Sequence, residues 1–181
     1  EAHAVTRRAV ARMEVAAGAL DHPLHLPASA DSGTPRPSHL SDELPFVLDV
    51  DENDAPGAQV YVGNIIKYER AQDVYMAFIP VWFDRRVAPD ASDKVEVQLA
   101  FSRDGIHWQR PWREPLISPG VLGPASAGQI FPVQNPIVVS DEIWLYFNAM
   151  AEDHLSETQV KGNSLLARAI WRLDRFVSVG S

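Results

Sequence analysis

The sequence predicts an all-β protein, and three observations lead to that prediction. From residue 57 onward the chain repeatedly forms runs rich in Val, Ile, Tyr, Phe and Trp, the residues that favour strands. Polar turn signals separate the runs, and a unit of four strand-like segments recurs. The expected strands are 59–68, 73–83, 94–102, 129–139 and 142–150.

The turns and the apolar content indicate how these strands are arranged. Turn signals stand at 69–72, at Asp104-Gly105 and at Ser140-Asp141. The apolar runs are too continuous for a sheet with one face in water. We therefore expect strands that are covered on both faces, as in stacked sheets or a sandwich.

The first 57 residues differ in texture from the rest. Residues 4–20 are rich in Ala and Arg, which favours a helix by local propensity. Residues 21–45 hold five prolines and many small polar residues, and show no periodicity. This part predicts either a long irregular connection across one face of the domain or a flexible linker.

An internal repeat favours strands over a helix near the N-terminus. Three segments each contain an apolar strand, a polar turn and a second short strand: 8–24, 97–111 and 165–179. The last two follow hairpin-like pairs, so the chain supplies two four-stranded units and half of a third. A recurring four-stranded unit is the signature of a β-propeller blade.

The repeat also predicts how the chain is divided. We expect the outer half of one blade over residues 1–24, an irregular connection over 25–57, and complete blades over 58–113 and 114–181. Propellers typically have at least about four blades. The remaining blades would then come from the same chain or from another chain. A β-sandwich is the alternative architecture.

Several phrases in order resemble the five-bladed propeller proteins related to glycoside hydrolase families 32 and 43. The resemblance implies a funnel along the propeller axis, with an acid, a nucleophile or base, and a third carboxylate on the innermost strands. Its motifs cover about 120 residues. They are NIIKYERAQDVYMAF (64–78), VEVQLAFSRDGIHWQRP (95–111), a loop with Pro115, Gly120 and Gly123, DEIWLYFNAMAEDH (141–154) and LLARAIWRLDRFVSV (165–179).

The acids that this resemblance requires are incomplete in the sequence. Glycoside hydrolysis needs two carboxyl groups, about 5–5.5 Å apart for retention and about 6.5–9.5 Å for inversion. The expected innermost strand near Gln129 is preceded by GPASAG (123–128), which has no carboxylate. The remaining catalytic candidates are Asp51, Asp54 and Asp153. The protein is therefore interpreted as a glycoside hydrolase or, alternatively, as a non-catalytic sugar-binding or assembly module.

Other residues are candidates for holding the sugar. Sugars present apolar C–H faces to aromatic rings, and polar groups fix their orientation. The substrate-binding candidates combine these two kinds of side chain: Tyr61, Trp82, Gln129, Glu152 and His154. For the AEDH segment (151–154) and the acidic segment 49–54, the alternative is a solvated loop. Trp144 and Trp171 fall within strands, where packing between sheets is expected.

The segment FSRDGIHWQRP (101–111) is interpreted as structural. Asp104-Gly105 is a hairpin signal, Ser102 can close the same turn, and Trp108 can cover the outer hydrophobic layer. The pattern resembles the Asp box of sialidase propellers, one residue shorter. That box lies on the periphery of a blade, which directs the search for function to the inner strands.

Composition narrows the class of partner. A net charge of −8 argues against nucleic acid, whose phosphates need a basic surface. The absence of cysteine excludes disulfides and thiolate sites, and no apolar run approaches the roughly 20 residues that span a bilayer.

The expected partner is carbohydrate, with homo-oligomerisation open because an incomplete propeller leaves strand edges unpaired. No organic cofactor is expected, and a calcium or sodium ion in the funnel is compatible with the resemblance. The first residue is Glu1 rather than Met, as expected for a processed or partial protein, so both secretion and the cytoplasm stay open.

Overall fold

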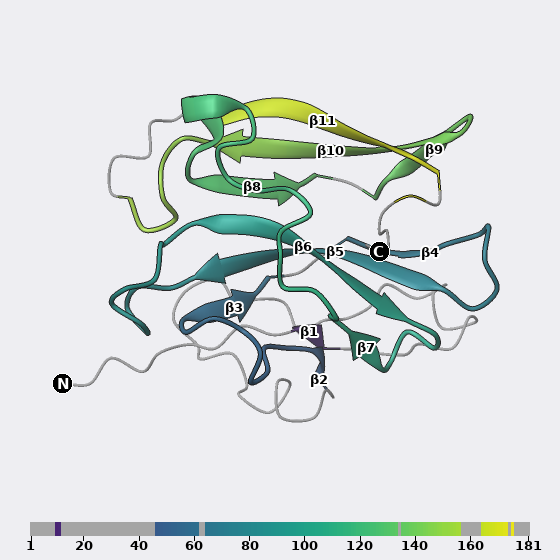
Figure 1. Ribbon diagram of the computed structural model, residues 1–181, viewed down its shortest axis with the longest axis horizontal. Helices are drawn as coiled ribbons and strands as arrows, with labels where there is room; N and C mark the ends of the chain where they lie inside the picture. The colour runs from purple at the N-terminus through teal and green to yellow at the C-terminus, as the bar shows by residue number, and fades with distance from the viewer. Residues whose placement is uncertain are drawn as a thin grey trace, which may run out of the picture.

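The computed structural model has an all-β architecture (Figure 1). It describes residues 10–11, 46–61, 64–133, 135–156, 164–173 and 175. Within these residues, the regular structure other than strands is the short 3₁₀ helix η2 (Gly123–Ser126). The same part of the molecule has no helix long and apolar enough to cross a bilayer. The all-β prediction is confirmed.

The first unit is an antiparallel sheet centred on β5 (Tyr75–Phe83). Two short strands, β3 (Ala58–Val60) and β4 (Asn64–Lys67), both pair with it on one side. On the other side β5 pairs with β6 (Val95–Ser102), which pairs with β7 (Trp108–Gln109). The strand predicted over 59–68 is thus divided between β3 and β4.

The second unit has a similar order around β10 (Glu142–Met150). The short strands β8 (Gln129–Pro132) and β9 (Ile137–Val139) both pair with β10, which pairs with β11 (Ser164–Arg172) on its other side. All these pairings are antiparallel. The strand predicted over 129–139 is divided in the same way as its counterpart in the first unit. Most of the expected turn and second strand after β11 lies outside the described residues.

The two units are joined and also packed against each other. One parallel pairing, Val95 with Gln129, links β6 to β8 and makes one nine-stranded sheet. Figure 1 shows β8, β10 and β11 as one layer above β5 and β6. Buried apolar side chains fill the space between the layers. They include Met76, Phe78, Val97 and Leu99 from the first unit and Ile130, Leu145 and Phe147 from the second.

A third, smaller layer covers the other face of the first unit. It consists of β1 (Val10–Ala11) paired antiparallel with β2 (Phe46–Leu48). Val10 and Leu48 pack with Ile79 and Val81 in a second buried cluster. β1 confirms strand rather than helix at its two residues. β2 adds a strand within the connection predicted over 25–57, while residues 12–45 lie outside the described part.

The predicted turn at Asp104-Gly105 is confirmed as the link between β6 and β7. Ser102 Oγ accepts a hydrogen bond from the Gly105 N–H at 2.9 Å, and Gly105 has a φ of 73°. Asp104 Oδ1 accepts bonds from the N–H groups of Ile106 and His107, both at 2.8 Å. The contact with the His107 ring and these backbone bonds lower the pKa of Asp104. Its polar groups therefore serve the turn itself.

Candidate functional site

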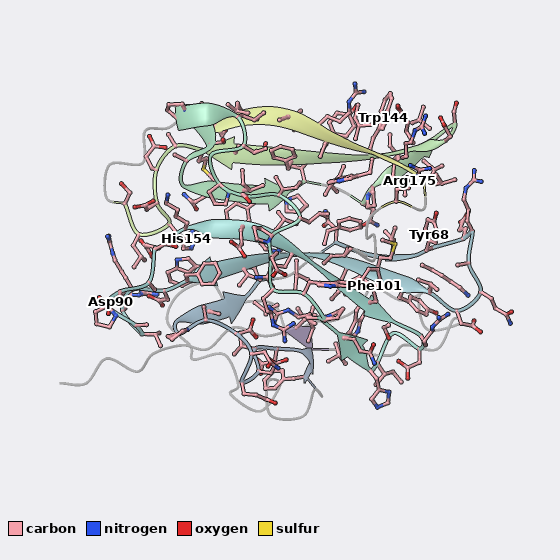
Figure 2. All side chains as sticks on the ribbon, in the orientation of Figure 1. Tyr68, Asp90, Phe101, Trp144, His154 and Arg175 are labelled. Carbon is pink, nitrogen blue, oxygen red and sulfur yellow. The ribbon has the colours of Figure 1, made fainter. Side chains whose placement is uncertain are left out.

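Three predicted sugar-binding residues meet at one end of the two units. Tyr61 follows β3, Gln129 begins β8, and His154 lies in the turn after β10. The Tyr61 hydroxyl is hydrogen-bonded to Nε2 of His154, and Nδ1 of His154 lies 2.7 Å from Oε1 of Gln129. In Figure 2, His154 is at the same end of the sheets as Asp90, opposite Tyr68. These three side chains form the polar line of the site.

Backbone contacts hold the turn that carries His154. The N–H of Gly128 donates to the carbonyl of Met150 at 3.0 Å. A Cβ on Gly128 would lie 2.0 Å from the Glu152 carbonyl oxygen, so only glycine allows this approach. The N–H of His154 donates to the Asp93 carbonyl at 2.9 Å. The turn is therefore fixed to both units.

Aromatic rings surround the polar line. The His154 ring lies 4.6 Å from the Trp82 ring, between centroids. Phe131 is 5.8 Å from Tyr61 and 6.2 Å from His154. Trp82 is fully buried, and its Nε1 donates to Oδ1 of Asp93 at 2.9 Å. In this arrangement Trp82 supports His154 from below, and Tyr61, Phe131 and His154 are the half-buried members of the group.

A buried carboxylate and an arginine complete the surroundings of Trp82. Both oxygens of Asp84 accept hydrogen bonds from Arg86, at 3.0 and 2.9 Å, and the guanidinium lies 5.0 Å from the Trp82 ring. Burial acts to raise the pKa of Asp84, but the bonds and charge of Arg86 and the bond from Gln59 hold it below its ordinary value. Asp84 is therefore a buried anion balanced by Arg86.

Gln59 is the one amide of this region with an unmatched oxygen among the described residues. Its Nε2 donates to Oδ2 of Asp84 at 2.8 Å, whereas its buried Oε1 has no hydrogen-bond partner. A carboxylate oxygen only accepts, so the amide nitrogen faces Asp84 and the oxygen identity is set. Gln59 lies directly opposite Trp82 in the sheet. Its oxygen is an acceptor beside the support of the site.

Two of the predicted acids flank the site. Asp153 and Glu152 are half-buried and precede His154 directly. The backbone carbonyl of Glu152 accepts a hydrogen bond from Nε2 of Gln129 at 2.9 Å, and that of Asp153 accepts from the Ser156 N–H. Both acids are thus near the polar line by position. Their catalytic or binding roles stay predictions.

The other two predicted acids are ion-paired at a different place. Asp54 is buried and receives two bonds from Arg110, at 2.8 and 2.6 Å. Arg110 also donates to Oε1 of Gln98 at 2.6 Å. Asp51 pairs with Arg113, and that hydrogen bond lowers the pKa of the Asp51 carboxyl. In this arrangement these acids tie the 49–57 loop to the end of β6 and β7; a catalytic role for either stays a prediction.

Sequence reasoning missed Glu96, Asp84 and Asp93. Burial raises the pKa of the half-buried Glu96 carboxyl, and the hydrogen bond from Gln98 and the charge of Arg110 offset only part of that rise. Glu96 points to the face of β6 opposite Val95, as strand alternation requires. A usable signal did exist for the two aspartates, because they bracket the DRRVAPDASD segment (84–93) that follows Trp82 and Phe83.

The described residues do not contain a group of three His, Asp or Glu side chains arranged to hold a metal ion. Both ring nitrogens of His154 are already engaged, by Tyr61 and Gln129. A calcium or sodium ion stays a prediction from the resemblance.

Comparison with known proteins gives two solved structures. No family model and no curated protein matches the sequence. A structure described as "Glycoside hydrolase" is 19% identical over 68% of this chain, with a TM-score of 0.46. Another, whose title names BT0996 in an RGII complex, is 19% identical over 74%, with a TM-score of 0.45. The protein spans 29% and 32% of their lengths. At this level of similarity, neither defines a family for it.

The fold and the site define a class in structural terms. This is an all-β protein with two packed antiparallel units and a polar and aromatic site where β3, β8 and the turn after β10 meet.

Proposed function

We propose that the site formed by Tyr61, Gln129 and His154 binds carbohydrate. The hydrogen-bonded line of these three side chains carries the proposal, because it presents a phenol, an imidazole and an amide together. Sugar hydroxyls both donate and accept hydrogen bonds, and sugar C–H faces pack on rings. Phe131, half-buried and 5.8 Å from Tyr61, supplies such a ring.

The same proposal includes the architecture. We propose that the two units are neighbouring blades of a five-bladed propeller of the glycoside hydrolase 32 and 43 type. Two features support this: the first unit is buried on both faces, and a further β layer, β1 with β2, covers the face away from the second unit. A β-sandwich is the rival architecture.

Glycosidic bond cleavage is the finer form of the proposal. Asp153 and Glu152 are the acids nearest to His154 in the sequence, and either could act only if a second carboxyl lies across the bound sugar. The rival is a sugar-binding module without turnover. Two observations favour it: β8 begins with Gln129, and both oxygens of Asp54 are taken by Arg110.

The proposal is tested by binding and turnover on one panel of plant and microbial polysaccharides and aryl glycosides. We expect the purified protein to bind at least one member, and Tyr61→Phe or His154→Asn to weaken that binding at least about tenfold, the cost of one good polar contact. The control is His107→Asn, because His107 is exposed and its ring is bonded to Asp104 of its own turn.

The outcomes separate the candidate functions. Release of reducing ends that Asp153→Asn abolishes would establish hydrolysis. Binding without any release would establish the non-catalytic module. Failure to bind every member of the panel, or equal binding by wild type and Tyr61→Phe, would reject this site as a carbohydrate site.

A further inference from the structure

We infer that Gln129 is a positioning residue that holds His154 as the tautomer protonated on Nδ1, so that Nε2 accepts the proton of the Tyr61 hydroxyl. The inference rests on the proposed function only for the use of that proton. It begins from the Gln129 side chain, which is 1% exposed and sits at the start of β8.

The orientation of the Gln129 amide is set by its second partner. Its nitrogen lies 2.9 Å from the backbone carbonyl of Glu152, which can only accept a hydrogen bond. The NH₂ group must therefore face Glu152. The amide oxygen must face His154, at 2.7 Å from Nδ1.

This orientation decides where His154 carries its proton. An amide oxygen is only an acceptor, so Nδ1 has to donate and must hold the hydrogen. In a neutral imidazole the other nitrogen is then an acceptor. Nε2 faces the Tyr61 hydroxyl, so Tyr61 donates its proton to His154.

The line of bonds gives the site a defined proton path. The proton on Tyr61 Oη can move to Nε2 of His154, leaving a phenolate and an imidazolium. The imidazolium keeps its Nδ1–H on Gln129, so no hydrogen bond is lost in the transfer. Trp82 at 4.6 Å and the bond from the His154 N–H to Asp93 keep the ring in place for it. Tyr61 is thereby the group of the site whose oxygen can gain negative charge.

The inference is tested on the free protein by two-bond ¹H–¹⁵N correlation of the histidine rings. The spectrum is recorded near pH 8, where histidines of ordinary pKa, about 6.5, are neutral. The sequence has six histidines, and His154→Asn identifies the signals of His154 by their loss. We expect the pattern of the Nδ1–H tautomer in the wild type.

Three variants separate positioning from simple packing. Gln129→Met keeps the shape but removes the acceptor, so signals of the Nε2–H tautomer should appear. Gln129→Glu restores an acceptor oxygen and should return the Nδ1–H pattern. Tyr61→Phe removes the partner of Nε2 and leaves Gln129 intact, so the Nδ1–H pattern should persist.

An Nε2–H tautomer in the wild type would overturn the inference, and so would an unchanged Nδ1–H pattern in a folded Gln129→Met variant. If Gln129→Met does not fold, the wild-type and Tyr61→Phe spectra still decide. Because no sugar is present, this failure is distinct from a failure of carbohydrate binding.

Discussion

The two units contain similar strands but bury them differently. In β5 every residue from Met76 to Trp82 is buried, whereas in β10 only alternate residues are, as Ile143, Leu145 and Phe147 illustrate. β5 has a layer on each side: β1 with β2 on one, and the second unit on the other. The comparison teaches that burial of these strands is determined by the layers around them rather than by their apolar content alone.

The faces that do not join the shared core also differ in how they hold charge. In the first unit Arg110 and Asp54 form a buried pair, with side chains 2% and 4% exposed. On the outer face of the second unit, the Arg168 guanidinium lies 3.8 Å from the Trp144 ring, and Leu166 is 64% exposed. The first unit should therefore depend on its outer contacts far more than the second.

The largest difference is expected for the two arginines. Arg110→Met should destabilise the protein by about 3–5 kcal/mol, because it leaves Asp54 as a buried charge without its main partner. Arg168→Met should cost less than about 1 kcal/mol, since it loses only a contact at an open face. Urea unfolding measures both. Arg110→Met with Asp54→Leu should recover most of the loss, and equal costs for the two single variants would remove the contrast between the units.

The next effect concerns apolar side chains on the same two faces. Ile79→Ala should cost about 2–5 kcal/mol, because Ile79 is fully buried against the β1–β2 layer. Ile170→Ala should change stability by no more than about 0.5 kcal/mol, because Ile170 is 44% exposed. Urea unfolding again gives both values. A cost for Ile170→Ala as large as that for Ile79→Ala would mean that this face is covered in solution.

The smallest effect is a pH dependence in the first unit. The folded pKa of Glu96 is raised by burial, so the folded state holds this proton more tightly than the unfolded state. Glu96 should then reduce stability as the pH rises above its unfolded value of about 4.5. Glu96→Gln should be more stable than the wild type at pH 7 and equal to it near pH 4, by thermal unfolding.

The exposed Glu114→Gln provides the control for that pH series, with no change of slope expected. Asp51 and Asp84 act in the opposite sense. Their lowered pKa values contribute stability that is lost as the pH falls below about 3.8, their ordinary value. A stability of Glu96→Gln that follows the wild type at every pH would contradict the assignment for Glu96.

The sequence is informative where structure is local. Alternating runs and turn residues predict the strands because β propensity and turn geometry act over a few residues, as at Asp104-Gly105. Tyr61 and Gln129 are predictable as site residues because they fall on the expected innermost strands. The division of 59–68 into β3 and β4 is not predictable in this way, since the run of strand-forming residues continues through both.

Contacts between distant segments could not be predicted from local patterns. Arg110 pairs with Asp54 across 56 residues, and nothing near Asp54 in the sequence indicates an arginine partner. His154 meets Tyr61 across 93 residues, and Trp82 is buried only because His154 and Arg86 cover it. Such contacts depend on how the two units pack, which is a property of the whole protein.

The most direct test of the central claim is to map a bound sugar by amide chemical-shift changes, using any carbohydrate that the panel identifies. We predict that the largest changes fall on 59–61, 129–131 and 152–155, the segments that carry Tyr61, Gln129 and His154. The turn at 102–108 should stay unchanged, because its polar groups bond to one another. Changes centred on that turn or on the Asp51–Asp54 loop, with none at His154, would contradict the account.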